Sequence, residues 1–208
     1  MRHVKGLSAV SALVVLTCLG CSNKPPDEDR DYPARIAEER ALKDAAFQKD
    51  SDPIPDNRKK DLLPLAYFPV DPDYKVAAVL KPTDDETVIP MPTSTGTARQ
   101  MRRAGLLEFT IKGQPTRLTA LVDLTDRNLE HLTVMFSDLT SGTETYPAGR
   151  YLDLSRNATG IYEIDFNRAY NPYCYYNASY ECPYPPPENR LKVPIRAGEK
   201  LKKEERKS

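Results

Sequence analysis

The sequence contains no tryptophan, carries no net charge and has only two histidines among its 208 residues. Without tryptophan, the buried core tryptophan typical of immunoglobulin domains is missing, so that topology is not predicted. Thirty basic residues balance thirty acidic ones, and Glu204 and Glu205 interrupt the basic stretch at 200–207. The chain therefore lacks the positive surface that a nucleic-acid groove requires, and we expect no nucleic-acid partner.

The scarcity of histidine also weighs against metal-dependent and serine-hydrolase chemistry. Beyond residue 20 the only histidine is His131. Together with Cys174 and Cys182 it supplies three ligands, whereas a structural zinc site needs four. An exposed strand residue is the alternative to a catalytic role for His131, and no G-x-S-x-G motif is present. The hydroxyl-rich segment 93–96 lacks the lysine of a P-loop and is expected to form a turn. The sequence predicts no metal and no cofactor.

The long apolar run of the sequence lies at residues 7–17 and follows Arg2 and Lys5. About eleven apolar residues are too few to span a bilayer, which needs about 20. A basic start followed by a short apolar run is typical of a secretory signal rather than of a membrane helix. Residues 1–20 are therefore predicted to be a signal peptide.

Cys21, preceded by Gly20, resembles the lipobox cysteine of bacterial lipoproteins, which is acylated and becomes the first residue of the mature chain. Cys18 stands where leucine is usual, and a frame with Cys18 as the acceptor fits the cleavage pattern less well. An ordinary signal peptide followed by a chance cysteine is the alternative. The polar linker within 21–31 favours lipidation, and Ser22 favours sorting to the outer membrane. We expect a lipid-anchored protein of the bacterial cell envelope, facing the periplasm, with the membrane as one partner.

Two cysteines, Cys174 and Cys182, remain for the mature domain. An even pair in an oxidising compartment predicts a disulfide. Closing so short a loop would stabilise the fold by about 2–3 kcal/mol in the chain-entropy model. A metal site is the competing interpretation, and it would need two further ligands.

Helix-forming patterns are confined to an N-terminal segment at residues 32–64. Pro33 suits the first turn of a helix at 33–49, and the proline-containing stretch at 52–56 ends it. A shorter helical turn is expected near 57–63.

The segment 65–198 is predicted to be a β domain because short apolar runs alternate with turn residues. Leu107, Phe109 and Ile111 alternate with polar residues, which is the period of a half-buried strand, and a hairpin turn is expected at 112–114. Strands are predicted at 75–80, 87–91, 106–111, 116–122, 132–136, 150–154, 161–166 and 191–195. Such short strands favour a mostly β fold, an antiparallel β-sandwich or a partly open barrel, which is α+β only through its single N-terminal helix. The charged tail at 199–208 is predicted to be disordered.

Polar and aromatic residues are concentrated between positions 165 and 190. Six of the twelve tyrosines lie between Tyr170 and Tyr184. Tyrosine offers a rigid contact area with a hydrogen-bonding tip, which suits sugars or peptides. The alternative is a structural loop that folds over an open end of the β core.

The same region resembles an uncharacterised bacterial family, the domain of unknown function 1684. The resemblance covers about residues 38–200, and it implies a shared core or surface but no activity, substrate or catalytic residue. It rests on the motifs DFNRAYNPYC (165–174), CP (182–183), PPPENRL (185–191), IRAGEK (195–200), Lys43-Asp44 with Phe47, YFPVDPDY (67–74), TSTG (93–96) and ETYPAGRYL (144–152).

We consider three functions for the mature domain. The first is a module that binds an unknown ligand or envelope protein through the 165–190 face, with the candidate residues Asn167, Arg168, Asn171, Tyr173, Asn189, Arg190 and Arg150. The second is a hydrolase that uses Asp165 and Glu188 as a carboxylate pair, with glycans as the candidate substrates. The third is an assembly factor with a flat apolar patch in place of a pocket. The sequence alone does not decide whether the protein is an enzyme.

Overall fold

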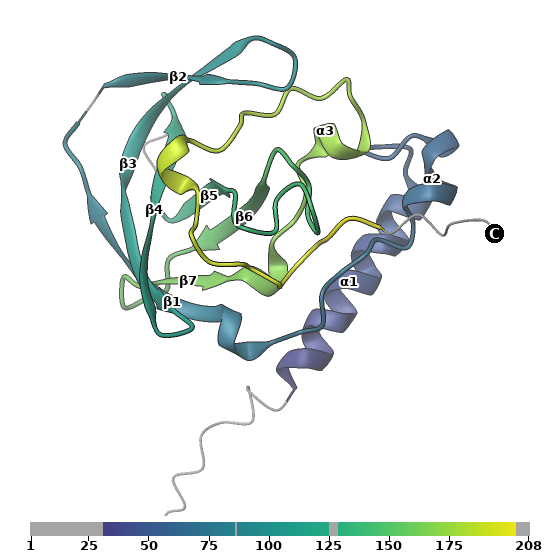
Figure 1. The fold of residues 1–208 in the computed structure, drawn as a ribbon, viewed down its shortest axis with the longest axis horizontal. Coiled ribbons are helices and arrows are strands. Elements are labelled where there is room, and N and C mark those ends of the chain that lie inside the picture. The colour runs from purple at the N-terminus through teal and green to yellow at the C-terminus, as the bar shows by residue number, and fades with distance from the viewer. Residues whose placement is uncertain (1–30, 86, 125–128, 203–208) are drawn as a thin grey trace, which may run out of the picture.

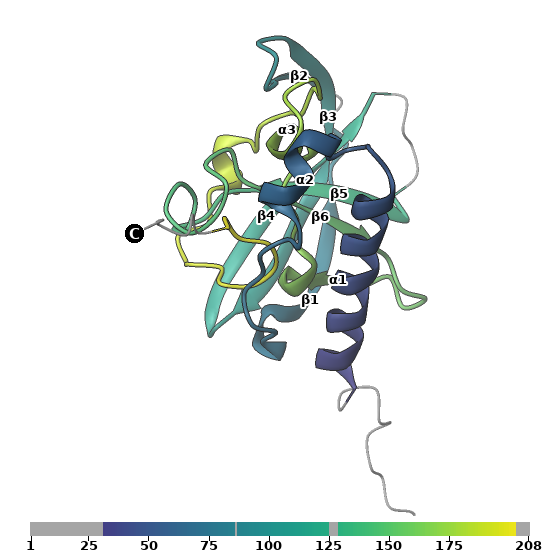
Figure 2. The ribbon, with the colours of Figure 1, turned by 90° about the vertical axis from the view of Figure 1, so that its right-hand side faces the viewer.

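The computed structural model describes residues 31–85, 87–124 and 129–202. Two antiparallel sheets form its body and helices lie at one side (Figures 1 and 2). The mostly β fold that the sequence predicts is confirmed. The elements in chain order are α1 (Tyr32–Lys49), α2 (Asp56–Leu62), η2 (Pro72–Tyr74), β1 (Lys75–Pro82), β2 (Val88–Pro92), β3 (Ala98–Ile111), β4 (Gln114–Asp123), β5 (His131–Phe136), β6 (Arg150–Ser155), β7 (Tyr162–Asp165), η3 (Phe166–Arg168), α3 (Tyr173–Tyr176) and η4 (Pro187–Asn189).

The long strand β3 organises the larger sheet. Along one edge it pairs first with β2 and then with β1, and along the other edge it pairs with β4 through the predicted hairpin at 112–114. β1 continues the sheet to β7, while β5 and β6 form a separate two-stranded sheet. β4 contacts β5 and β6 contacts β7, but they belong to separate ladders. The fold is therefore an antiparallel β-sandwich and not a closed barrel.

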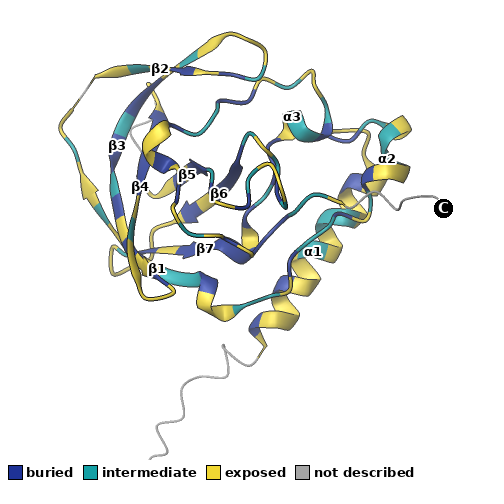
Figure 3. Ribbon diagram, viewed as in Figure 1, coloured by how far each residue is buried: buried dark blue, intermediate teal, exposed yellow. Residues whose placement is uncertain are grey.

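The core lies between the two sheets, where alternate residues of each strand meet. Leu107, Phe109 and Ile111 are buried as their period of two predicts, while the intervening residues of β3 face solvent. The ring centroids of Phe136 and Phe166 lie 5.2 Å apart in an edge-to-face contact, which joins β5 to the end of β7. Figure 3 shows these inner faces as the buried part of the fold.

Helix α1 lies outside the sandwich and buries only a narrow stripe of side chains: Tyr32, Ile36 and Phe47. Polar contacts complete its docking, because Arg40 donates to the backbone oxygens of Phe68 and Asn167 at 3.0 and 3.1 Å. None of the described helices is long and apolar enough to cross a membrane. Residues 1–30, which include Cys18, Cys21 and the predicted linker, lie outside the described residues.

Two predictions about the C-terminal segment are wrong. The expected strand at 191–195 is irregular, because the Leu191 N–H pairs with the Ser137 carbonyl and the Ile195 N–H with the Asp138 carboxylate rather than with a neighbouring strand. The start of the predicted disordered tail is fixed, because Glu199 is only 1% exposed and residues 200–202 make hydrogen bonds to the domain. Residues 203–208 lie outside the described residues.

Candidate functional site

Arg150, predicted to bind a ligand, instead holds the C-terminal segment from inside the fold. Its side chain is 1% exposed. It donates to the carboxylate of Asp138 at 2.9 Å and to the backbone oxygens of Ile195, Ala197 and Glu199. A guanidinium with these four acceptors is a structural clamp and has no access to a ligand.

The three predicted asparagines are also buried. Asn189 pairs with the backbone of Thr119 through both ends of its amide, at 2.7 and 2.9 Å, and also donates to the Met135 carbonyl. It thereby takes the place of a strand at the edge of β4. Asn167 bonds the Asp71 backbone in the same way, and Asn171 is 1% exposed. The amides of Asn167 and Asn189 satisfy buried backbone groups, whereas the side-chain oxygen of Asn171 is buried without a partner among the described residues.

The structure does not bring Asp165 and Glu188 together. Asp165 is 4% exposed at the end of β7 and pairs with Arg168 at 3.0 Å. Glu188 lies on η4 and pairs with Arg103 of β3 at 3.2 Å. Glu188 lines two grooves, and Asp165 lines neither of them. An acid and a base must flank one scissile bond, and this arrangement does not provide that geometry.

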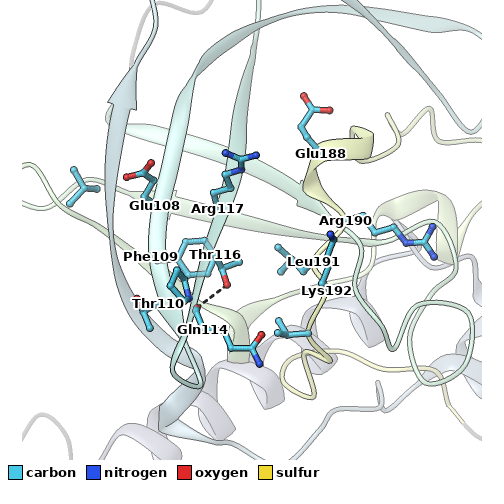
Figure 4. Close-up of a pocket in the computed structure, with 13 residues that line it drawn as sticks. Glu108, Phe109, Thr110, Gln114, Thr116, Arg117, Glu188, Arg190, Leu191 and Lys192 are labelled. Carbon is cyan, nitrogen blue, oxygen red and sulfur yellow. Dashed lines mark hydrogen bonds between the residues drawn. The ribbon is translucent and has the colours of Figure 1, made fainter.

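The remaining predicted residues are exposed but lie at different sites. Arg168 is held by Glu39 of α1 at 2.7 Å. Arg190 lines a wide groove of about 950 Å³ between the β3–β4 hairpin and residues 188–193. Figure 4 shows that its guanidinium points away from the strands of this groove. Tyr173 lines a different cleft, so the 165–190 segment is not a single binding face.

The cleft at Tyr173 has a volume of about 480 Å³ and combines aromatic rings with charged groups. It lies between α1, β3, β6 and the loop that contains α3. Two edge-to-face pairs of rings form its wall, with centroids 6.0 Å apart for Tyr151–Tyr170 and 5.2 Å apart for Tyr173–Tyr180. Its lining consists of Lys43, Arg99, Tyr151, Asp153, Tyr170, Pro172, Tyr173, Tyr180, Glu181, Cys182 and Pro183. We call it the tyrosine cleft.

The two ring pairs differ in how their hydroxyls are used. Tyr151 donates to the Pro183 carbonyl at 2.5 Å, and Tyr170 donates to Asp153 at 3.0 Å. Burial raises the pKa of both phenols, so they remain protonated donors. The hydroxyls of Tyr173 and Tyr180 have no hydrogen-bond partner within the described residues, and Tyr173 is 42% exposed. This outer pair is free to contact a ligand.

Charged groups at the cleft keep unused hydrogen-bonding capacity. The guanidinium of Arg99 makes one loose contact, from Nε to Glu181 at 3.9 Å. Asp153 accepts from Tyr170 and from Thr133 on the neighbouring strand. A carboxylate has about four lone-pair sites, so each acid can accept further bonds.

The segment 93–97 forms the predicted turn and fixes one wall of the cleft. The hydroxyl of Ser94 donates to the Tyr180 carbonyl at 2.9 Å and accepts from the Cys182 N–H at 3.1 Å. The hydroxyl of Thr97 donates to Glu181 at 2.7 Å. The turn thus positions the cleft residues 180–182, and its hydroxyls are occupied in doing so.

Lys43 and Glu199, 156 residues apart, fix the opposite wall. Lys43 Nζ lies 2.6 Å from Glu199 and 5.0 Å from the centroid of the Tyr170 ring. The second oxygen of Glu199 accepts from the Asn171 N–H at 2.9 Å and from the Tyr176 hydroxyl at 2.5 Å. Three donors compensate the buried carboxylate for its loss of hydration. The network therefore holds α1, α3 and the segment around Glu199 in one arrangement.

Sequence reasoning found part of this cleft. Tyr170, Tyr173 and Cys182 lie in the segment singled out for its aromatic residues, whereas Lys43, Arg99 and Tyr151 come from elsewhere. Lys43 and Tyr151 fall within the family-like motifs, which is the signal that could have found them. Arg99 has no such signal.

Comparison with known proteins places the chain in a family. Residues 60–200 match the family model described as "Protein of unknown function (DUF1684)". The solution NMR structure of an uncharacterised protein from Haloarcula marismortui is 32% identical, with a TM-score of 0.64, over 84% of this chain and 97% of that one. No curated protein matches the sequence. The chain belongs to the DUF1684 family, as its motifs predict.

Proposed function

We propose that this chain is a lipid-anchored protein of the bacterial envelope that binds a saccharide in the tyrosine cleft. One observation carries the proposal: family-like motifs that are distant in the sequence meet at this cleft. The cleft is lined by Lys43, by Tyr151, by three residues of the segment 170–173 and by the segment 182–183, and the turn at 93–97 supports it.

The composition of the cleft suits a sugar ring. A sugar presents apolar C–H faces and a rim of hydroxyls, and tyrosine rings with polar tips match both features. Arg99, Asp153 and Glu181 provide donors and acceptors around the rings. The volume of about 480 Å³ is within the usual range for small-ligand sites, roughly 300–1,000 Å³.

Binding is favoured over hydrolysis because the candidate carboxylates are separated and paired. Asp165 and Glu188 each contact a different arginine. Asp153 and Glu181, the acids of the cleft, accept hydroxyl donors from Thr133 and Thr97. Both acids are thus held by hydroxyls of the fold.

Titration of the mature protein with tetrasaccharides of the N-acetylated, neutral and uronic classes tests the binding proposal. Isothermal calorimetry is expected to detect one class, with Kd raised at least about tenfold in Tyr173→Ala/Tyr180→Ala, which corresponds to about 1.4 kcal/mol. The matched variant Tyr173→Phe/Tyr180→Phe keeps the rings and should retain most of the affinity. If no class binds, or if the alanine variant binds as well as the wild type, the proposal is wrong.

The anchor is tested separately. A palmitate analogue should label the wild type but not Cys21→Ala, and Ser22→Asp should move the protein from outer-membrane to inner-membrane fractions. Label that persists in Cys21→Ala would contradict lipidation at this residue. An unchanged fractionation of Ser22→Asp would contradict the sorting role of Ser22.

A further inference from the structure

Two thiols lie in contact behind the tyrosine cleft. Cys174 is the second residue of α3 and is partly exposed, whereas Cys182 is buried at the cleft wall. Both are free thiols, and the backbone N–H of Cys174 donates to Cys182 Sγ at 3.2 Å.

The surroundings make the two sulfurs chemically unequal. The side chains of Cys182, Ser94 and Tyr146 lower the pKa of Cys174 to about 6 by hydrogen bonding, although burial opposes this. Hydrogen bonding with Cys174, together with burial, raises the pKa of Cys182. Cys174 is thus the nucleophile of the pair, and Cys182 keeps its proton.

We propose that Cys174 and Cys182 are a redox-active dithiol that exchanges with low-molecular-weight disulfides. The proposal rests on the contact between the Cys174 N–H and Cys182 Sγ, the donors around Cys174 and its access to solvent. It does not depend on saccharide binding. It also goes beyond a structural disulfide, because it assigns the pair a reversible reaction and each cysteine a separate role.

The exchange proceeds in two balanced steps. The Cys174 thiolate attacks one sulfur of the disulfide RSSR, the S–S bond breaks, and RS⁻ leaves and takes a proton from water. Cys182 then loses its proton and attacks Cys174 Sγ, which releases the second RS⁻ to accept that proton. The two cysteines are oxidised by two electrons in total and RSSR is reduced to two RSH. Because Cys182 Sγ already lies 3.2 Å from the backbone nitrogen of Cys174, the second step needs little movement of the chain.

The first measurement is the pH dependence of alkylation on the reduced, full-length mature protein, with the modified residue assigned by peptide mass spectrometry. Iodoacetamide should modify Cys174 with a midpoint near pH 6 and should modify Cys182 only at alkaline pH. Cys182→Ala should move the Cys174 midpoint toward the ordinary thiol range, near 8.5. Tyr146→Phe should move it in the same direction, while Tyr180→Phe, which removes an unpaired hydroxyl nearby, should leave it unchanged.

The second measurement is the reaction with glutathione. Oxidised glutathione should convert the wild type to an intramolecular disulfide, seen as the loss of two hydrogen atoms, and reduced glutathione should reverse it. Cys182→Ala should instead accumulate a mixed disulfide on Cys174. An alkylation midpoint above 8 for wild-type Cys174, an unchanged thiol content in oxidised glutathione, or a disulfide that reduced glutathione does not open would each overturn the proposal.

Discussion

Replacing Arg150 by methionine tests whether this residue is a structural clamp or part of a binding surface. Methionine keeps an apolar stem of similar length in β6 but removes every donor. The change leaves the buried carboxylate of Asp138 without its cation at 2.9 Å. It also leaves the backbone oxygens of Ile195, Ala197 and Glu199 without their guanidinium donor.

The magnitude of the loss follows from the pair that is broken. Removing one partner of a buried ion pair costs about 3–5 kcal/mol, because the other charge stays buried. The three carbonyls add little if the irregular segment at 195–199 opens and takes up water. For a domain of this size, 1 kcal/mol lowers Tm by about 2–4 °C. We therefore expect Arg150→Met to lower Tm by about 6–20 °C.

Urea unfolding followed by circular dichroism gives the free energy of unfolding of the wild type and of the variant. Arg196→Met is a matched control, because Arg196 lies in the same segment but pairs with Glu144 at the surface, 2.8 Å away. An exposed pair contributes about 0–1 kcal/mol. Faster amide hydrogen exchange at 195–199 in Arg150→Met would locate the damage. A loss below 1 kcal/mol, or one equal to that of Arg196→Met, would refute the clamp.

Three further predictions concern single residues. Gly149 has φ +88° and an added Cβ would lie 2.5 Å from the Phe136 carbonyl oxygen, so Gly149→Ala should lower the free energy of unfolding by at least about 2 kcal/mol in urea. The hydrogen bond from Arg168 lowers the pKa of Glu39 in the folded protein. The stabilisation by this pair is therefore complete above the pKa of Glu39 in the unfolded chain and is lost as the pH falls through its pKa in the folded protein. Glu39→Gln should flatten the acid side of a plot of Tm against pH. In Asn189→Asp the new carboxyl group would face the backbone oxygens of Thr119 and Met135, which favour its protonated form. The Tm of this variant should therefore fall as the pH rises above about 4. Unchanged urea or pH profiles would contradict these assignments.

The strand pattern was predictable because burial on a sheet imposes a period of two. Leu107, Phe109 and Ile111 show this period and are buried in β3. Leu191 and Ile195 also sit at alternating positions and are buried, yet their segment is not a strand. Alternation reports an extended chain with one face inside, and it does not report whether a neighbouring strand is available for pairing.

The candidate site was harder to predict because its walls depend on contacts between distant residues. Nothing in the local sequence of Lys43 or Glu199 indicates that they pair across 156 positions, and the charged neighbours of Glu199 are typical of a disordered tail. The tyrosine cluster was informative only in part. Tyr170, Tyr173 and Tyr180 line the cleft, whereas Tyr176 is fully buried beneath the loop.

The asparagines and arginines of the C-terminal third resemble a binding set for a physical reason. Between residues 166 and 202 the described chain has only short helical turns, but much of it is buried against the sandwich. Buried backbone groups there have no neighbouring strand and no water to hydrogen-bond with, so side-chain amides and a guanidinium bond to them instead. Asn189 on the backbone of Thr119 is the clearest case.

This use of polar side chains also explains how a site can be built on loops. A binding site needs groups held in fixed positions, and loops are rigid only when their backbone groups are bonded. Arg150 and Asn189 provide that rigidity, and their burial leaves them no access to a ligand. Tyr173 and Tyr180 belong to a loop that is fixed in this way, and their hydroxyls have no partner in the described part of the chain. Unused hydrogen-bonding capacity at an exposed position, rather than polarity itself, therefore distinguishes a binding residue from a structural one in this fold.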